Sequence, residues 1–255
     1  MTEQEKQVLR FEKNLQKVVK KLDNKLRDLL AEFDTRAGVL TSTDSSKALL
    51  LKRELTQALK DTGYYDLIKD TLKESSVMAD IRIKELKDVI GKRFSEIDKT
   101  VINGLNKMNY GEMINISETA INSIQNKTMQ SVILGLNKAN LIKELSGELD
   151  KFQNYAETYI TTSKRIYSQT VEDEIADQVG FGEDKDDIWE YVGAPLQNNS
   201  HKECIWGVPK RYFTNDEKID FEQGNYAGGS FDPMRYNCQH NFQISDVTYE
   251  QAFGK

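Results

Sequence analysis

The segment Ile188-Trp189-Glu190-Tyr191-Val192 marks the point at which the sequence changes character. Its alternating aromatic and β-branched side chains are typical of a strand, and Gly193-Ala194-Pro195 ends it. Before Gly182, apolar residues instead recur at three- and four-residue intervals, which predicts helices. We therefore expect a mainly α protein, with a long, coiled-coil-like helical region over residues 1–182 and a small α+β module over residues 183–255.

A few turn and cap residues divide the helical region. We expect helices at about residues 2–37, 46–61, 64–107, 112–137 and 140–179, with a break at Ser75-Ser76 and a turn at Asn109-Tyr110-Gly111. The apolar stripe of the first helix consists of Val8, Phe11, Leu15, Val18, Leu22, Leu26, Leu29 and Phe33. So narrow a stripe is buried only against other helices, of the same chain or of another copy, which predicts a protein present in multiple copies.

Charge and apolar content exclude several classes of protein. The formal net charge of -6 argues against a globally basic nucleic-acid binder, because phosphate binding depends on clustered Lys and Arg. Residues 1–20 are charged throughout and contain no apolar signal core, and no run approaches the roughly 20 apolar residues that cross a bilayer. We expect a protein made in a reducing cytoplasm, without a membrane segment.

Local signals also place elements within the module. Thr214 and Glu217 have the spacing of a capping box and predict a short helix that ends at Gly224. The residues from Cys238 to Ile244 are typical of a final strand. The module therefore combines at least two strands and one helix.

Both cysteines and both histidines of the chain lie in this module, as His201-x-x-Cys204 and Cys238-x-His240. Thiolate and imidazole are preferred zinc ligands, and four of them close a structural tetrahedral site. The sequence therefore predicts a structural zinc ion bound by His201, Cys204, Cys238 and His240. Two other interpretations stay open: two buried, reduced thiols, or one Cys204–Cys238 disulfide bridge.

Catalysis has weaker signals. A catalytic metal or a cysteine nucleophile needs a positioned acid or base, and the spacing of Glu203, Asp216 and Glu217 singles out none of them. Gly228-Gly229-Ser230 lacks the lysine and the strand–helix context of a phosphate-binding loop. We expect no enzymatic activity.

Cations alternate with aromatic residues through the module. They are Lys202, Lys210, Arg211 and Arg235, interleaved with Trp206, Tyr212, Phe213 and Tyr236. Such a mixture can contact DNA non-specifically through phosphates and stacking, or it can be an aromatic core with a cationic rim.

An ordered set of short motifs in this region resembles a known family. The matching residues are Tyr191-Val192-Gly193-Ala194-Pro195, Cys204, Tyr212-Phe213-Thr214-Asn215-Asp216-Glu217-Lys218-Ile219, Gly228-Gly229 and Asn237-Cys238-Gln239-His240. They resemble the C-terminal domain of phage Mu F-like head morphogenesis proteins, the minor head proteins of tailed phages. The match covers about residues 155–245, and Tyr159-Ile160-Thr161-Thr162-Ser163 stands where that family has an Arg-Thr-Glu-like segment. Ala194 is inserted before the proline, and His201 and Gln239 stand where the family has arginines.

The resemblance implies a structural virion protein, located in the capsid interior or at the portal vertex and made in the cytoplasm of a bacterial host. It would act in head morphogenesis, DNA packaging or ejection, with the portal protein or other virion proteins as partners. Two alternatives are a zinc-dependent nuclease or toxin-like effector with a helical delivery region, and a cytoplasmic coiled-coil adaptor.

Overall fold

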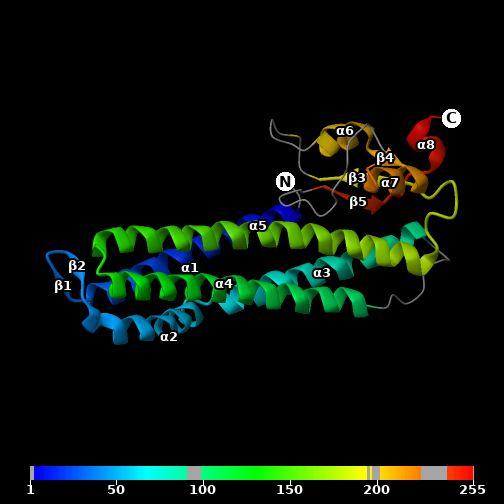
Figure 1. The fold of residues 1–255 in the computed structure, drawn as a ribbon. Coiled ribbons are helices and arrows are strands. Elements are labelled where there is room, and N and C mark those ends of the chain that lie inside the picture. The colour runs from blue at the N-terminus through cyan, green and yellow to red at the C-terminus, as the bar shows by residue number, and fades with distance from the viewer. Residues whose placement is uncertain (1–2, 91–98, 194–195, 197–201, 225–239, 255) are drawn as a thin grey trace. The chain divides into compact units, whose positions relative to one another are not determined.

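The computed structural model describes residues 3–90, 99–193, 196, 202–224 and 240–254. These residues are mainly helical, with a small mixed segment near the C-terminus, which confirms the predicted fold class (Figure 1). The elements are α1 (Glu3–Ala31), β1 (Thr35–Arg36), β2 (Val39–Leu40), α2 (Ser45–Asp61), α3 (Tyr64–Ile90), α4 (Thr100–Leu134), α5 (Lys138–Val179), β3 (Trp189–Val192), α6 (Lys202–Lys210), β4 (Tyr212–Phe213), α7 (Asn215–Glu222), β5 (Asn241–Ile244) and α8 (Tyr249–Phe253). None of the described helices is both long and apolar enough to span a bilayer.

The chain forms two compact units. The helical unit comprises residues 7–72 and 108–159, and the mixed unit comprises residues 1–6, 73–107 and 160–255. The mixed unit thus contains helical residues from before position 182 as well as the segment that follows it. The division into domains at residues 182 and 183 stays a prediction.

The helical unit buries the apolar stripe of α1 within the same chain. Seven of the eight predicted stripe residues are buried, and Leu30 is buried where the spacing had suggested Leu29. Tyr64, at the start of α3, is fully buried, and its hydroxyl donates to the carbonyl of Met113 at 2.9 Å. Its ring meets Phe152 edge to face, with centroids 5.6 Å apart. Aliphatic and aromatic side chains from distant parts of the sequence therefore form this core.

Three predictions about the helices are wrong. Helix α1 ends at Ala31 rather than near Ala37: Thr35 and Arg36 pair with β2 instead of continuing the helix, and Ala37 and Gly38 adopt positive φ in the turn between the two strands. Helix α3 runs through the predicted break at Ser75-Ser76, where Ser76 Oγ accepts a hydrogen bond from Asn106. Helix α4 runs through the predicted turn at Asn109-Tyr110-Gly111, where the buried Asn109 accepts a hydrogen bond from Tyr159 at 3.0 Å. Partners distant in sequence satisfy these polar side chains, so they do not compete for the local backbone.

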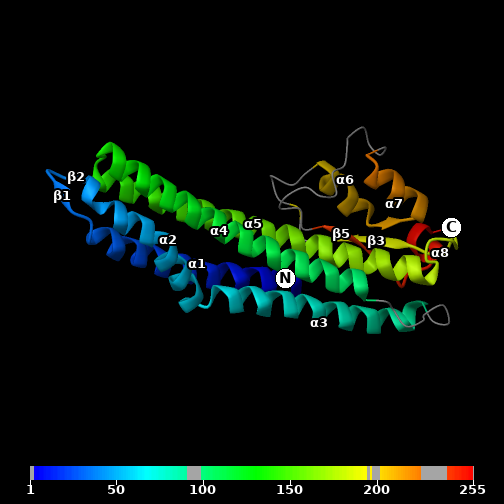
Figure 2. The ribbon, with the colours of Figure 1, turned by 60° about the horizontal axis from the view of Figure 1, so that its bottom comes forward.

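The β1–β2 hairpin lies at the end of the helical unit where α4 passes into α5 (Figures 1 and 2). The amide of Leu40 donates to the carbonyl of Leu136 at 3.0 Å, and the amide of Lys138 donates to the carbonyl of Gly38 at 2.9 Å. The Lys138 ammonium also donates to the carbonyls of Ala31 and Phe33. These bonds join the end of α1, the hairpin and the α4–α5 connection.

Asp44, just before α2, holds the chain that follows the hairpin. The side chain is buried, accepts the amide hydrogen of Asp34 at 3.1 Å and pairs with the Lys47 ammonium at 3.0 Å. Burial acts to raise the pKa of Asp44, but Lys47 and the hydrogen bonds to the carboxylate outweigh it and lower this pKa below 3.8. The ionised carboxylate therefore stabilises the folded state.

We expect Asp44→Asn to lower the free energy of unfolding at pH 7 by about 1–2 kcal/mol, because it removes a charge-assisted pair from a buried position. A carboxyl with a lowered folded-state pKa stabilises the fold above its unfolded pKa, and this stabilisation is lost as the pH falls through the folded-state pKa. The difference between wild type and variant should therefore shrink below pH 3.8. Urea unfolding across the acid range measures it, with the exposed Asp61→Asn as control. An undiminished difference at low pH would contradict this role.

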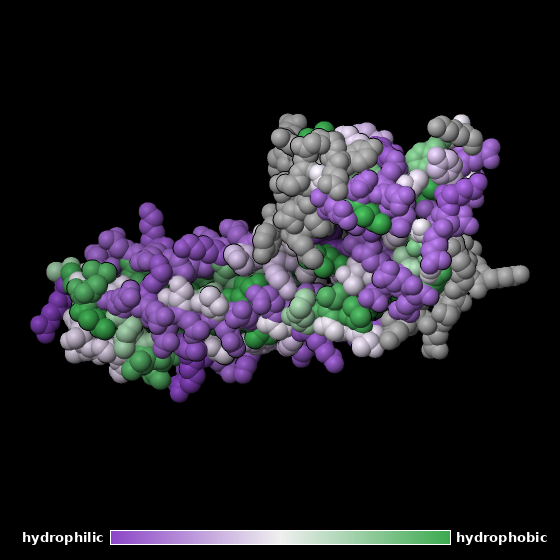
Figure 3. All heavy atoms as spheres, turned by 45° about the vertical axis from the view of Figure 1, so that its right-hand side comes forward, coloured by the Kyte–Doolittle hydropathy of each residue, from purple (hydrophilic) through white to green (hydrophobic). Residues whose placement is uncertain are grey.

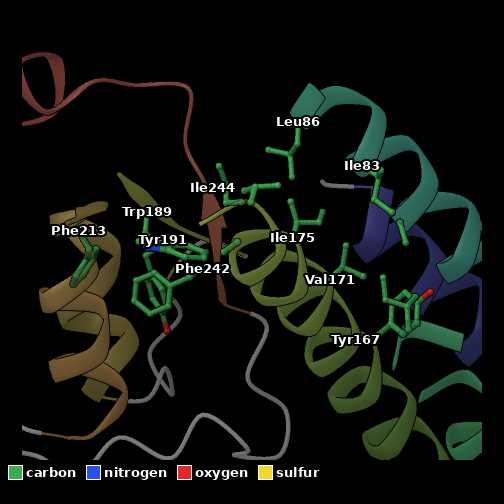
Figure 4. Packing of buried hydrophobic residues seen from close by; sticks show 14 of the residues in the cluster. Ile83, Leu86, Tyr167, Val171, Ile175, Trp189, Tyr191, Phe213, Phe242 and Ile244 are labelled. Carbon is green, nitrogen blue, oxygen red and sulfur yellow. The ribbon is translucent and has the colours of Figure 1, made fainter. Parts of the chain in front are cut away.

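The mixed unit is built on a three-stranded antiparallel sheet with the order β4-β3-β5. In the register, Trp189 lies opposite Phe213 on one side and opposite Ile244 on the other. Figure 4 shows the sheet residues Trp189, Tyr191, Phe242 and Ile244 together with residues of α3 and α5. All belong to one hydrophobic cluster, which includes Leu86 of α3 and Ile175 of α5. The sheet therefore packs on these helices and shares one hydrophobic core with them.

Strand β5 is held against α5 by side chains that take the place of a further strand. Gln169 accepts the amide hydrogen of Phe242 at 2.8 Å, and Glu172 accepts that of Ile244 at 2.9 Å. Arg82, from α3, donates to both oxygens of Glu172 at 2.5 and 3.2 Å and to the carbonyl of Ile244 at 2.8 Å. We call Arg82, Glu172 and the backbone of Ile244 the strand clamp. It satisfies edge groups that would otherwise be buried without partners.

Glu172 is almost completely buried. Desolvation raises the pKa of its carboxyl, and the Arg82 guanidinium only partly offsets this rise. The guanidinium is therefore what allows a carboxylate to occupy this position.

We expect Arg82→Met to lower the free energy of unfolding by about 3 kcal/mol, because Glu172 then keeps its burial but loses its counter-charge. Adding Glu172→Gln to this variant should recover part of the loss, since it removes the buried charge and keeps an acceptor for Ile244. Denaturant titration of the single and double variants gives the coupling, with the exposed Arg53→Met as control. Additive effects of the two substitutions would show that the pair is not coupled.

Candidate functional site in the C-terminal module

Two of the four predicted zinc ligands lie on elements that flank β3. Cys204 is on α6, and His240 immediately precedes β5, which pairs with β3. Both side chains are buried. His201 and Cys238 lie outside the described residues. Helix α6 and strand β5 thus set the positions of Cys204 and His240 relative to β3.

Tyr191, on β3, contacts both described ligands. Its hydroxyl lies 3.9 Å from Cys204 Sγ, and its ring stacks on the His240 imidazole with centroids 5.5 Å apart and an interplanar angle of 15°. Cys204 and His240, which are 36 positions apart in the sequence, therefore contact the same side chain. Both lie next to Tyr191.

An aromatic cluster surrounds Tyr191. The ring centroids of Phe242, Phe221 and Phe213 lie 4.9, 5.4 and 6.2 Å away, and Trp206 packs against Phe213 and Phe221. Most of these pairs have the edge-to-face geometry that aromatic rings favour. The surroundings of Tyr191 are thus mainly an apolar core.

Helix α6 approaches this core closely because residue 207 is glycine. A β-carbon at Gly207 would lie 2.8 Å from the Tyr191 ring and 3.1 Å from Phe221. The first distance is shorter than side chains tolerate, so only glycine fits without displacing the ring. Gly207 thereby sets the separation of α6 from β3, and with it the position of Cys204.

Lys210, Arg211 and Lys218 pair with acids of the module and of helix α5. Lys210 contacts Glu217 at 2.5 Å and lies over the Phe213 ring, and Arg211 contacts Glu190 at 2.6 Å. Lys218 is buried, pairs with Asp173 and Glu222, and lies over the Trp189 ring. Burial raises the pKa of Glu222, and Lys218 opposes that rise. Lys210 and Arg211 therefore resemble the rim of an aromatic core, and DNA contact stays a prediction. Arg235 lies outside the described residues.

A metal site is not assembled from the described residues alone. Among them, no three His, Cys, Asp or Glu side chains are grouped closely enough to hold an ion. Cys204 and His240 supply one thiol and one imidazole, which fits half of a Cys2His2 donor set. The four-ligand zinc site stays a prediction, as do the alternatives of two reduced thiols and a disulfide.

The capping residues agree with the sequence. Thr214 accepts the amide hydrogen of Glu217, and the Glu217 carboxylate accepts that of Thr214 at 3.0 Å, so the predicted capping box is confirmed. The predicted strand at β3 is confirmed as well, and β5 lies within the predicted final strand.

Sequence reasoning missed α6, β4 and the strand clamp. Helix α6 is short and contains Pro209 in its last turn, which weakens its helical signal. Arg82 and Glu172 look like ordinary polar residues of two different helices. They are 90 positions apart, so no local pattern predicts that they contact each other.

Comparisons with protein-family models, with curated proteins and with solved structures find no match to this chain.

We expect Gly207→Ala to lower the free energy of unfolding by about 1–3 kcal/mol, because the added methyl group collides with Tyr191. Gly104→Ala is the matched control, since Gly104 is an exposed residue of helix α4 with nothing within 4 Å of the added carbon. Alanine should stabilise that position by up to about 1 kcal/mol. Thermal unfolding of both variants measures the difference, and equal effects would contradict the close approach of α6.

Proposed function

We propose that the chain is a structural minor head protein of a tailed phage, without enzymatic activity, that associates with the portal or the capsid interior and acts in head morphogenesis. The observation that carries the proposal is the ordered motif set that resembles phage Mu F-like head morphogenesis proteins. In this chain, Tyr191, Cys204, Phe213 and His240 of that set are buried in a single small module. Thr214 and Glu217, from the same set, cap its helix α7.

The roles of these residues agree with a structural function. Tyr191 joins Cys204 and His240, and Phe213 lies in the same aromatic cluster. Core and cap residues maintain a fold and need no reactive group. A motif set made of such residues is therefore what a folded anchor of a larger assembly requires.

The helical unit offers a surface for such an assembly at the end that contains the hairpin. Ile133 and Leu134, at the end of α4, are 68% and 69% exposed, and Leu136 and Val39 beside them are also exposed. Val39 packs next to Gly135 and bridges to Asn137, so these residues are neighbours. Figure 3 shows apolar side chains gathered at this end. Exposed apolar groups of this kind mark interaction sites, and we assign this surface to the portal or another virion protein.

The first test is whether the chain is present in purified virions and binds purified portal protein. We expect Ile133→Ser/Leu134→Ser to weaken portal binding at least tenfold, because burying two such side chains contributes more than about 1.4 kcal/mol. The fold should be unchanged, since both residues are exposed. Leu49→Ser/Leu50→Ser on α2 is the matched control, because these leucines are also exposed.

Two results would overturn the proposal. One is absence of the chain from virions together with no binding to portal protein. The other is metal-dependent cleavage of DNA by the purified chain that is lost in Cys238→Ala, which would instead support the zinc-dependent nuclease.

A further inference from the structure

One face of α5 is polar where it meets β5. Arg165, Ser168, Gln169 and Glu172 lie at intervals of three and four residues, so they share this face. Three of them bond to β5: Ser168 accepts from the Asn241 side chain, Gln169 from the Phe242 amide and Glu172 from the Ile244 amide. Arg165 is the remaining member.

These contacts fix the place of Arg165 in the fold. They follow the same order along both elements, so β5 runs in the direction of α5. The turn of α5 that contains Arg165 precedes Ser168, and His240 precedes Asn241. Arg165 therefore lies beside the beginning of β5, near the residue whose imidazole stacks on Tyr191.

Arg165 is only 3% exposed, and its Nε and Nη2 atoms are buried with no hydrogen-bond partner among the residues that the structure describes. Nε and Nη2 form one edge of the guanidinium, with two N–H donors that point in the same direction. Arg82 uses this same edge to bind both oxygens of Glu172. An arginine edge that is buried without an acceptor is costly, so its retention calls for an explanation.

We propose that the Nε–Nη2 edge of Arg165 is a binding site for a small oxyanion, a phosphate or a carboxylate, beside the start of β5. Two oxygens of such a group match the two donors, as the Glu172 carboxylate matches those of Arg82. The burial of Arg165 favours a compact ion over a polymer backbone. This site is independent of the proposed role in the phage head and of the predicted zinc ion.

Thermal unfolding of the full chain at pH 7 tests the site, with sodium phosphate, sodium acetate and sodium chloride compared at equal ionic strength. A ligand that binds only the folded state raises Tm. We expect phosphate or acetate to raise Tm by about 3–6 °C over chloride at ten times its Kd. Which of the two ions is more effective distinguishes a phosphate from a carboxylate ligand.

Arg165→Met should abolish this rise, and Arg165→Lys should weaken the binding at least tenfold, because lysine lacks the paired donors. The exposed Arg53→Met is the matched control and should keep the full response. Should Arg165→Met fail to fold, the wild-type titrations and Arg165→Lys decide the question. No rise over chloride in the wild type, or a full response in either Arg165 variant, overturns the proposal.

Discussion

The placement of the C-terminal sheet depends on a carboxylate that is almost completely buried. Glu172 accepts the Ile244 amide hydrogen from strand β5, and Arg82 neutralises its charge while donating to the carbonyl of the same residue. A single pair of side chains thus satisfies both edge groups of Ile244 and links α3, α5 and β5. A buried carboxylate without a counter-charge would be strongly unfavourable, so the packing of α3, α5 and β5 depends on the Arg82–Glu172 pair.

The module built on this anchor is organised around Tyr191. Its hydroxyl contacts the thiol of α6, and its ring contacts the imidazole before β5 and three phenylalanines. Gly207 lets α6 approach that ring without a collision. The motif residues that resemble phage Mu F-like head morphogenesis proteins are thus largely those that build the core and cap a helix. A pattern of this kind marks a fold more directly than a reaction, and this is why we propose a structural function.

Arg82 and Arg165, two arginines of the mixed unit, contrast with each other. Arg82 directs its Nε and Nη2 donors to a carboxylate, whereas those of Arg165 meet no acceptor in the described part of the chain. Paired donors that bind a carboxylate explain the burial of Arg82, and they suggest that the same donors of Arg165 also bind two oxygens. The oxyanion that we propose would use the same paired geometry as the Arg82–Glu172 contact, whose carboxylate lies about two turns along α5 from Arg165.

The sequence by itself determined what depends on neighbouring residues. The apolar stripe of α1, the strand at β3 and the Thr214–Glu217 capping box follow from periodicity, side-chain branching and a three-residue spacing, and all are present. Only the tertiary structure decided the rest. Ser76 and Asn109 do not interrupt their helices because Asn106 and Tyr159 satisfy them. The strand clamp and the shared contact at Tyr191 join residues far apart along the chain. Local patterns do not encode which polar groups meet, because that depends on how all the helices and strands pack.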